Sequence, residues 1–220
     1  MTKAERLEKM KEDLIRMSRM EKELYKNGNE RGAVRYIAGV DEVGRGPLAG
    51  PVVAAAVILP EDFSVLGVND SKKLSEKRRE ELYEMILREA VAWSIGMRDN
   101  EVIDRINILE ATKEAMTEAV QNLAIAPDHI LIDALTLPEI DIPQTGIVRG
   151  DAESVSVAAA SIVAKVTRDR MMVKYHEIYP GYAFDSNKGY GTKAHYEGLE
   201  RSGLCAIHRK SFLKKYFASK

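Results

Sequence analysis

The sequence predicts an α/β domain built around a mixed sheet, and three observations support this prediction. Segments rich in β-branched residues alternate with segments whose apolar residues recur at helical spacing. The first two β-rich segments, 36–41 and 52–59, are joined by the Gly- and Pro-rich residues 44–51, which suits adjacent antiparallel strands. The later strands alternate with helices, and this order after an antiparallel start indicates three layers with a mixed sheet in the middle.

Each element also has local evidence of its own. Residues 52–59 lack polar alternation, so this strand should be buried on both faces. Residues 3–25 contain neither Gly nor Pro and place apolar side chains at helical spacing, which predicts one amphipathic helix. Ser75 is a suitable N-cap for a helix that extends to about Glu89. The other expected strands are 91–97, 129–133 and 146–148, and the other expected helices are 109–123 and 154–176.

Composition excludes several classes of protein. The 220 residues are 45% hydrophobic and 30% charged, which is typical of a soluble globular protein. The longest apolar run, 52–59, is far shorter than the roughly 20 residues that a membrane-spanning helix needs. A single cysteine cannot form an internal disulfide, and the charged first residues do not resemble a secretory signal. We therefore expect a cytoplasmic protein that does not associate with a membrane.

Charge is distributed unevenly along the chain. Residues 1–35 hold ten Lys and Arg against seven Asp and Glu, and residues 188–220 hold eight against two. The middle of the chain holds 15 against 25. An acidic centre between basic ends suits a metal-dependent enzyme that acts on a polyanion, although chance composition explains such a division about equally well.

Acidic residues follow two of the predicted strands. Asp41 and Glu42 end the first, and Asp133 ends 129–133, while Asp151 precedes the Ala-rich helix. Ligand sites of open α/β sheets lie at the carboxyl ends of strands, so Asp41 and Asp133 are expected to converge. Carboxylates that are crowded together need a cation, and oxygen ligands favour Mg²⁺ or Mn²⁺. These four acids therefore indicate a two-metal site that could hydrolyse a phosphodiester.

The same acids also have a structural interpretation, because an Asp at a strand end often caps a turn or a helix. Adjacent side chains of a regular strand point to opposite faces. Either the strand bends at Asp41 and Glu42, which Gly44 and Gly46 would make easy, or Glu42 serves a neighbouring ion from the rim. Asp169 lies in the middle of a predicted helix, which favours a structural part for it.

Residues 44–51 (GRGPLAGP) match neither the phosphate-binding loop of nucleoside triphosphatases nor a dinucleotide-binding fingerprint. Glycines on both sides of Arg45 would let a nucleic-acid backbone approach main-chain groups that can bind a ribose 2′-hydroxyl, while the guanidinium binds phosphate. Such a tripeptide is more often a simple turn, so it is weak evidence by itself.

Six motifs resemble, in the same order, the signatures of the bacterial type 2 ribonucleases H (ribonuclease HII). They span roughly residues 36–213, and their order is far more specific than any one of them. The motifs are 41–51 (DEVGRGPLAGP), 70–74 (DSKKL), 132–134 (IDA), 150–151 (GD) with 158–169 (AAASIVAKVTRD), 187–192 (NKGYGT) and 208–212 (HRKSF).

The resemblance implies an RNase H-like fold, in which helices flank a five-stranded mixed sheet. It also implies endonucleolytic cleavage of the RNA strand of RNA–DNA hybrids, and cleavage on the 5′ side of ribonucleotides embedded in duplex DNA. The products would carry a 5′-phosphate and a 3′-hydroxyl. Two Mg²⁺ or Mn²⁺ ions are expected with substrate.

The resemblance further assigns residues to this activity. The metal-binding acids of the family match four residues here, Asp41, Glu42, Asp133 and Asp151. The loop that contacts the ribonucleotide matches Gly44, Arg45 and Gly46, and Tyr190 matches the tyrosine that packs on the sugar at the RNA–DNA junction. Lys72, just before a predicted helix, fits a phosphate contact.

The expected organisation is an N-terminal helical extension in residues 1–35 and an RNase H-like catalytic domain with a basic C-terminal region in residues 36–220. The positive balance of the extension suggests that it adds substrate affinity. We expect a monomer whose partners are RNA–DNA hybrids and DNA duplexes with embedded ribonucleotides, and the sequence points to no protein partner.

Two alternative functions remain open at this point. A DNA junction resolvase or transposase-type nuclease of the same fold also uses clustered acids, but it needs no sensor of a 2′-hydroxyl. A non-catalytic hybrid-binding module, in which the acids only cap turns, would bind nucleic acid without dependence on Mg²⁺.

Overall fold

The computed structural model describes residues 2–218, which form one five-stranded mixed sheet with helices on both faces. The strands lie in the order β3-β2-β1-β4-β5, with β1 antiparallel to β2 and parallel to β4. This arrangement confirms the predicted fold class. The strands are β1 (Ile37–Val43), β2 (Val52–Ile58), β3 (Ala92–Arg98), β4 (His129–Asp133) and β5 (Gln144–Ile147).

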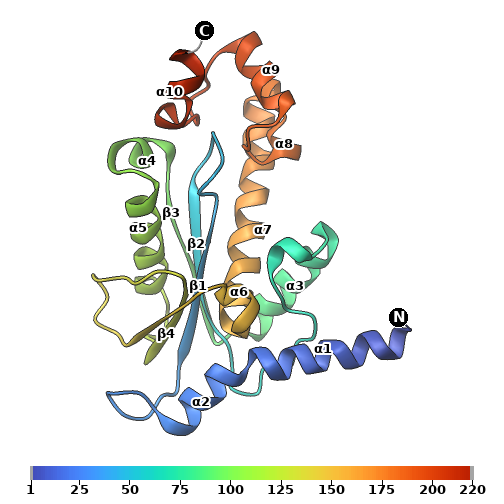
Figure 1. Ribbon diagram of the computed structural model, residues 1–220, viewed down its shortest axis with the longest axis vertical. Coiled ribbons are helices and arrows are strands. Elements are labelled where there is room, and N and C mark those ends of the chain that lie inside the picture. Colours follow the sequence, from blue (N-terminus) through green and yellow to red (C-terminus); the bar gives the residue numbers. More distant parts are fainter. Residues whose placement is uncertain (1, 219–220) are drawn as a thin grey trace.

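Helices cover both faces of the sheet (Figure 1). The long helix α7 lies on one face together with α3, and α5 lies on the other together with α4. The helices are α1 (Lys3–Met17), α2 (Arg19–Asn27), α3 (Glu76–Glu89), α4 (Asn100–Ile106), α5 (Ile108–Gln121), α6 (Gly150–Glu153), α7 (Val155–Ile178), α8 (Phe184–Asn187), α9 (Lys193–Ser202) and α10 (Lys210–Ala218), with 3-10 turns η1 (Ser71–Lys73) and η2 (Pro180–Tyr182).

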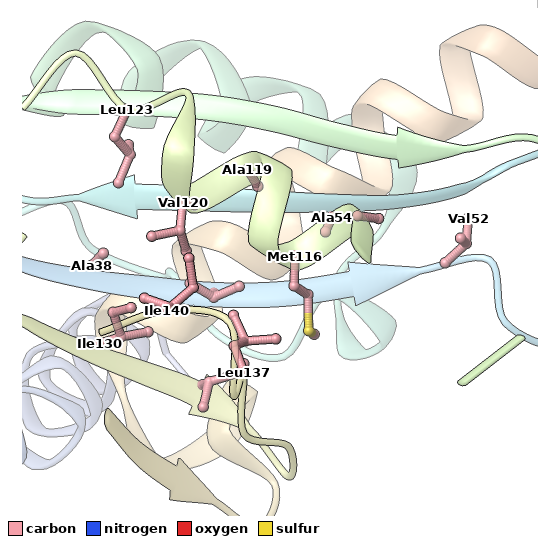
Figure 2. Close-up of a cluster of buried hydrophobic side chains, with 14 of the residues drawn as sticks. Ala38, Val52, Ala54, Met116, Ala119, Val120, Leu123, Ile130, Leu137 and Ile140 are labelled. Atoms are coloured by element: carbon pink, nitrogen blue, oxygen red, sulfur yellow. The ribbon is translucent and has the colours of Figure 1, made fainter. Parts of the chain in front are cut away.

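Strand β2 is buried along its whole length, as its continuous apolar sequence predicts. Its side chains alternate between two hydrophobic clusters, so that Ala54 packs on the α5 side and Ala55 on the α7 side. Figure 2 shows the cluster on the α5 side, where Met116 and Ala119 of α5 lie over the sheet. Small side chains in the strands let both helix layers come close to the sheet.

The N-terminal segment differs from its prediction. Residues 3–25 do not form a single helix, because α1 ends at Met17 and α2 begins at Arg19. Between them, Ser18 has the dihedral angles of a helix cap, and its hydroxyl donates to the carbonyl oxygen of Leu14 (2.8 Å). Such a side-chain bond to the preceding turn competes with helix continuation.

A second difference lies before α5, where the pattern of apolar residues does not predict α4. Asn107 separates the two helices, since it adopts a left-handed conformation with φ of +72°. Its Oδ1 accepts the backbone amide of Leu109 (2.9 Å) and so caps α5. A sharp turn of this kind, rather than a loop, joins α4 to α5.

The C-terminal helices pack around a third hydrophobic cluster beyond the end of the sheet. Phe184 of α8, Leu199 of α9 and Leu213 of α10 belong to this cluster together with Met172 of α7. Ala49, in the connection between β1 and β2, is also part of it. The Gly-rich connection is therefore fixed against the C-terminal helices and does not extend freely into solvent.

Within residues 2–218, no helix combines the length and the apolar character needed to cross a membrane.

The backbones of β1 and α7 come very close to each other at Gly39. A Cβ atom added to Gly39 of β1 would lie 2.0 Å from the carbonyl carbon of Ser156, so neither backbone has room for it. We expect Gly39→Ala to lower the free energy of unfolding by about 3 kcal/mol or more, because overpacking here must move backbone. The control is Gly181→Ala, whose Cβ would make an ordinary 3.5 Å contact with Ser202. Urea denaturation that gives both variants the same stability would contradict this packing.

Candidate active site

Parallel pairing of β1 and β4 brings two acids together. Val40 pairs with Ile132, so the next residues, Asp41 and Asp133, lie on neighbouring strands at the same level of the sheet. Asp41 is only 5% exposed. The two strands come from positions 92 residues apart in the sequence, and their convergence is a direct result of the sheet topology.

A third acid, Asp151, approaches from α6, and Asp133 holds the start of that helix. The backbone amide of Gly150 donates to Oδ1 of Asp133 (2.7 Å). Arg149, just before it, turns the chain in a left-handed conformation with φ of +60°. Asp151 is 7% exposed and is one residue from this contact, so α6 carries its carboxylate towards the ends of β1 and β4.

Glu42 follows Asp41 without a bend in the strand. The ladder between β1 and β2 continues regularly through both residues, as Asp41 pairs with Ala55 and Glu42 with Ala54. The two side chains therefore leave opposite faces. Asp41 lies on the α7 side, where it bonds to the hydroxyl of Ser161, whereas Oε1 of Glu42 lies 3.4 Å from Nη1 of Arg45.

Burial and neighbouring carboxylates raise the pKa values of three of the acids. Burial raises the pKa of Asp41 well above its ordinary value, and the charges of Glu42 and Asp133 raise it further. Burial also raises the pKa of Glu42, against the opposing effect of Arg45. The pKa of Asp151 is raised by burial and then by the charge of a fourth aspartate, Asp70, against the effect of Lys72. In each case the charged form lacks the solvation that water would give it.

Two groups on the α7 side were missed by sequence reasoning about the site. Asp70 caps η1 by accepting the amide of Lys72 (2.9 Å), and its charge acts on Asp151. Ser161 bonds to Asp41 and shares a hydrogen bond with the hydroxyl of Ser71 (3.0 Å). Asp70 and Ser161 lie inside quoted motifs but had no assigned role, and only the fold shows that these motifs meet.

Basic side chains border the acids. Nζ of Lys72 lies 3.6 Å from Oδ2 of Asp151, with four-fifths of its side chain exposed. The side chain of Arg45, beside Glu42, is 45% exposed. The positively charged side chains of Lys72 and Arg45 thus lie on two sides of the acids. Each keeps N–H donors that could reach a phosphate.

The conformation of the Gly44–Gly46 loop is fixed by a buried arginine. Arg209 is fully buried, and its guanidinium donates to the carbonyl oxygens of Gly44 (2.6 Å), Arg45 (2.9 Å) and Gly50 (2.9 and 3.0 Å). Burial and the neighbouring Arg168 lower the pKa of Arg209 to about 9, so it remains charged at neutral pH. The loop therefore lies on a buried positive charge.

A second buried arginine joins this loop to the segment of Tyr190. Arg168 donates to the carbonyl oxygens of Pro51 (2.9 Å), Ala49 (3.1 Å) and Lys188 (2.8 Å). Although burial lowers its pKa, the value of about 10 leaves it charged at neutral pH. Neither arginine has a carboxylate partner among its hydrogen bonds within residues 2–218, and the sequence gives no sign that such distant carbonyls satisfy them.

Tyr190 lies beside the glycine loop. Its side chain is 44% exposed, and a Cβ added to Gly46 would lie 3.6 Å from its ring. The backbone around it is held by a hydrogen bond from the amide of Leu48 to the carbonyl oxygen of Gly189 (2.8 Å). The predicted ribose-binding residues are therefore adjacent and leave an aromatic face open to a ligand.

The donor set fits a hard divalent cation by its chemistry. Within residues 2–218, no three His, Cys, Asp or Glu side chains are placed as ligands of a single ion. Buried carboxylates with raised pKa values nevertheless gain most from a cation, and all-oxygen donors suit Mg²⁺ or Mn²⁺. Asp169 is held by Lys165 (2.8 Å), in keeping with a structural part.

Comparisons with known proteins identify the family of this chain. A family model described as Ribonuclease HII matches residues 38–218. A ribonuclease HII of Ligilactobacillus salivarius (strain UCC118) is 60% identical over 194 residues, which cover 88% of this chain and 74% of that protein. The crystal structure of ribonuclease H2 from Pyrococcus horikoshii OT3 is 28% identical, with a TM-score of 0.69, and the match covers 84% of this chain and 98% of that one.

A further solved structure shares the fold. The PCNA:RNase HII complex from Archaeoglobus fulgidus contains a chain that is 29% identical, with a TM-score of 0.67, and the match covers 79% of this chain and 93% of that one. The RNase H-like fold and the family are therefore shown by independent sequence and structural matches. The chain belongs to the ribonuclease HII family, the type 2 ribonucleases H that hydrolyse RNA paired with DNA, and it is a hydrolytic endoribonuclease.

Proposed function

We propose that this endoribonuclease cleaves the RNA strand of RNA–DNA hybrids and the 5′ side of ribonucleotides embedded in duplex DNA, leaving a 5′-phosphate and a 3′-hydroxyl. The observation that carries the proposal is the convergence of acids from β1, β4 and α6, where burial and then neighbouring carboxylates, Asp133 among them, raise the pKa values of Asp41, Glu42 and Asp151. Turn-capping acids have no reason to be gathered in this way. An acidic centre without a cation would also repel nucleic acid, which disfavours a module that only binds hybrids.

The acids would hold two divalent cations, Mg²⁺ or Mn²⁺, when substrate is bound. Asp41 and Asp133 on the neighbouring strands β1 and β4 would supply oxygen ligands to them, together with Glu42 and Asp151. Two such ions supply charge that stabilises the attacking and leaving oxygens of a phosphodiester displacement. Lys72 would bind a backbone phosphate beside Asp151.

The glycine loop and Tyr190 would recognise the ribose. Gly44 and Gly46 leave the main chain on both sides of Arg45 free of side chains, and the buried Arg209 holds the carbonyl groups of Gly44 and Arg45. Tyr190 offers a ring face on which a sugar can pack. A 2′-hydroxyl both donates and accepts hydrogen bonds. A rigid backbone in contact with the ribose can therefore distinguish RNA from DNA. A junction nuclease of the same fold would need no such device.

The metal assignment predicts a charge-dependent loss of activity. Asp133→Asn keeps the shape of the side chain and an acceptor for the amide of Gly150, but it removes the ligand charge. We expect kcat on an RNA–DNA hybrid to fall at least about 100-fold, with duplex affinity and folding retained. Asp62→Asn, at an exposed acid, is the control. Gel assays that find full cleavage by the Asp133 variant would refute the assignment.

The raised pKa of Asp41 predicts how stability depends on pH. Because the pKa in the folded protein lies above the ordinary value of 3.8, the folded state binds this proton more tightly than the unfolded chain. The resulting stabilisation is complete below about pH 4 and is lost as pH rises through the raised value. We therefore expect Asp41→Asn to raise Tm at pH 8 in the presence of a chelator, and to abolish cleavage. A lower Tm at pH 8, measured by calorimetry, would favour a structural role.

Recognition of the ribose predicts a selective effect at Tyr190. Tyr190→Ala should lower kcat/KM about tenfold or more for a DNA duplex that contains one ribonucleotide, since stacking on an aromatic ring contributes about 1–3 kcal/mol. The partly exposed position makes loss of stability small. Tyr190→Phe retains the ring and tests the hydroxyl separately. An unchanged preference for RNA over DNA in Tyr190→Ala would place the recognition of the 2′-hydroxyl elsewhere.

A further inference from the structure

The N-terminal helices lie against the segment that carries Asp151. Figure 1 shows α1 and α2 running beneath α6. Met17, at the end of α1, is fully buried in the same hydrophobic cluster as Val155 at the start of α7. The N-terminal extension is therefore packed onto the junction between α6 and α7, which follows directly after Asp151.

A buried glutamate of α2 bonds to this junction. Glu21 is 4% exposed, and its Oε1 accepts from the hydroxyl of Ser154 (2.6 Å) and from the backbone amide of Ser156 (3.1 Å). Its Oε2 is buried and has no hydrogen-bond partner within residues 2–218. A carboxylate so deeply buried is costly unless it has compensating interactions. The positive end of the 24-residue helix α7 supplies one.

An arginine of α1 holds the other side of the junction. Nη1 of Arg16 donates to the carbonyl oxygen of Ala152 (3.0 Å) and lies 3.6 Å from Oε2 of Glu153. Arg16 thus contacts the two residues after Asp151, and Glu21 contacts the next turn. Together they fix the chain over 152–156.

The helix that carries Asp151 needs this support. α6 has only four residues, too few to be stable alone, so its position depends on contacts with other elements. Asp133 holds its beginning through the amide of Gly150, and the N-terminal helices hold its end. These two attachments flank Asp151 along the chain.

We propose that Glu21 is a positioning residue, through which the N-terminal extension directs Asp151 towards Asp133 and the divalent cation. This inference rests on the proposed function. This role differs from the substrate affinity that the charge of the extension suggests. A buried Glu21 cannot itself contact a duplex. A positioning role affects the metal and kcat, whereas a substrate-binding role affects KM.

The test compares Glu21→Ala and Glu21→Gln with Glu23→Ala, a control at an exposed glutamate of the same helix. Mn²⁺ binding is measured by titration calorimetry without nucleic acid, and kcat and KM are measured on an RNA–DNA hybrid. We expect Glu21→Ala to weaken Mn²⁺ binding about tenfold, as loss of a group that orients a ligand does, and to lower kcat with KM unchanged. Glu21→Gln keeps an acceptor and should recover part of both, and Glu23→Ala should match the wild type.

Wild-type Mn²⁺ affinity in Glu21→Ala, or a change in KM alone, would overturn the inference. If circular dichroism shows that Glu21→Ala is unfolded, Mn²⁺ binding is measured on Arg16→Ala instead. This variant removes the contact of α1 with residues 152–153 and changes a partly exposed side chain. Unchanged Mn²⁺ affinity in Arg16→Ala would then overturn it. A wild-type protein that neither binds Mn²⁺ nor cleaves the hybrid would refute the proposed function itself, an outcome distinct from equal behaviour of the variants.

Discussion

Acidic side chains are buried beside one another where β1 and β4 run in parallel, and the rest of the structure has to accommodate their desolvation and repulsion. The pKa values of Asp41, Glu42 and Asp151 are all raised for this reason. A fold selected for stability alone would avoid such a group. Its position on rigid central strands suits the cation site proposed above.

Two buried arginines, Arg168 and Arg209, accompany these acids. Arg168 and Arg209 donate to main-chain carbonyls and so convert the connection after β1 and the segment before Tyr190 into one rigid unit. Their charge lies beneath the loop where a sugar–phosphate backbone would lie, while the acids need cations that can also contact a phosphate. The opposite charges of the two parts therefore suit the same polyanion.

Local patterns in the sequence predicted much of the fold. The uninterrupted apolar run of β2 predicted a buried strand, and Ser75 predicted the start of α3. Both predictions succeeded because they depend only on neighbouring residues in the sequence. The meeting of Asp41 with Asp133 could be expected from strand ends in an α/β sheet. The bond between Glu21 and Ser154 joins residues 133 positions apart and leaves no pattern in the sequence. Likewise, the sequence places Asp169 next to Arg168, but the hydrogen-bond partners of Arg168 are carbonyl oxygens that are distant in the sequence.

The most direct test of the central claim is to locate the cation. Crystals of the protein in Mn²⁺ would be measured for anomalous scattering at the manganese edge. The account predicts a peak between the carboxylates of Asp41 and Asp133, at about 2.2 Å from their oxygens as expected for a hard divalent ion. Peaks confined to exposed acids, with none between β1 and β4, would contradict it.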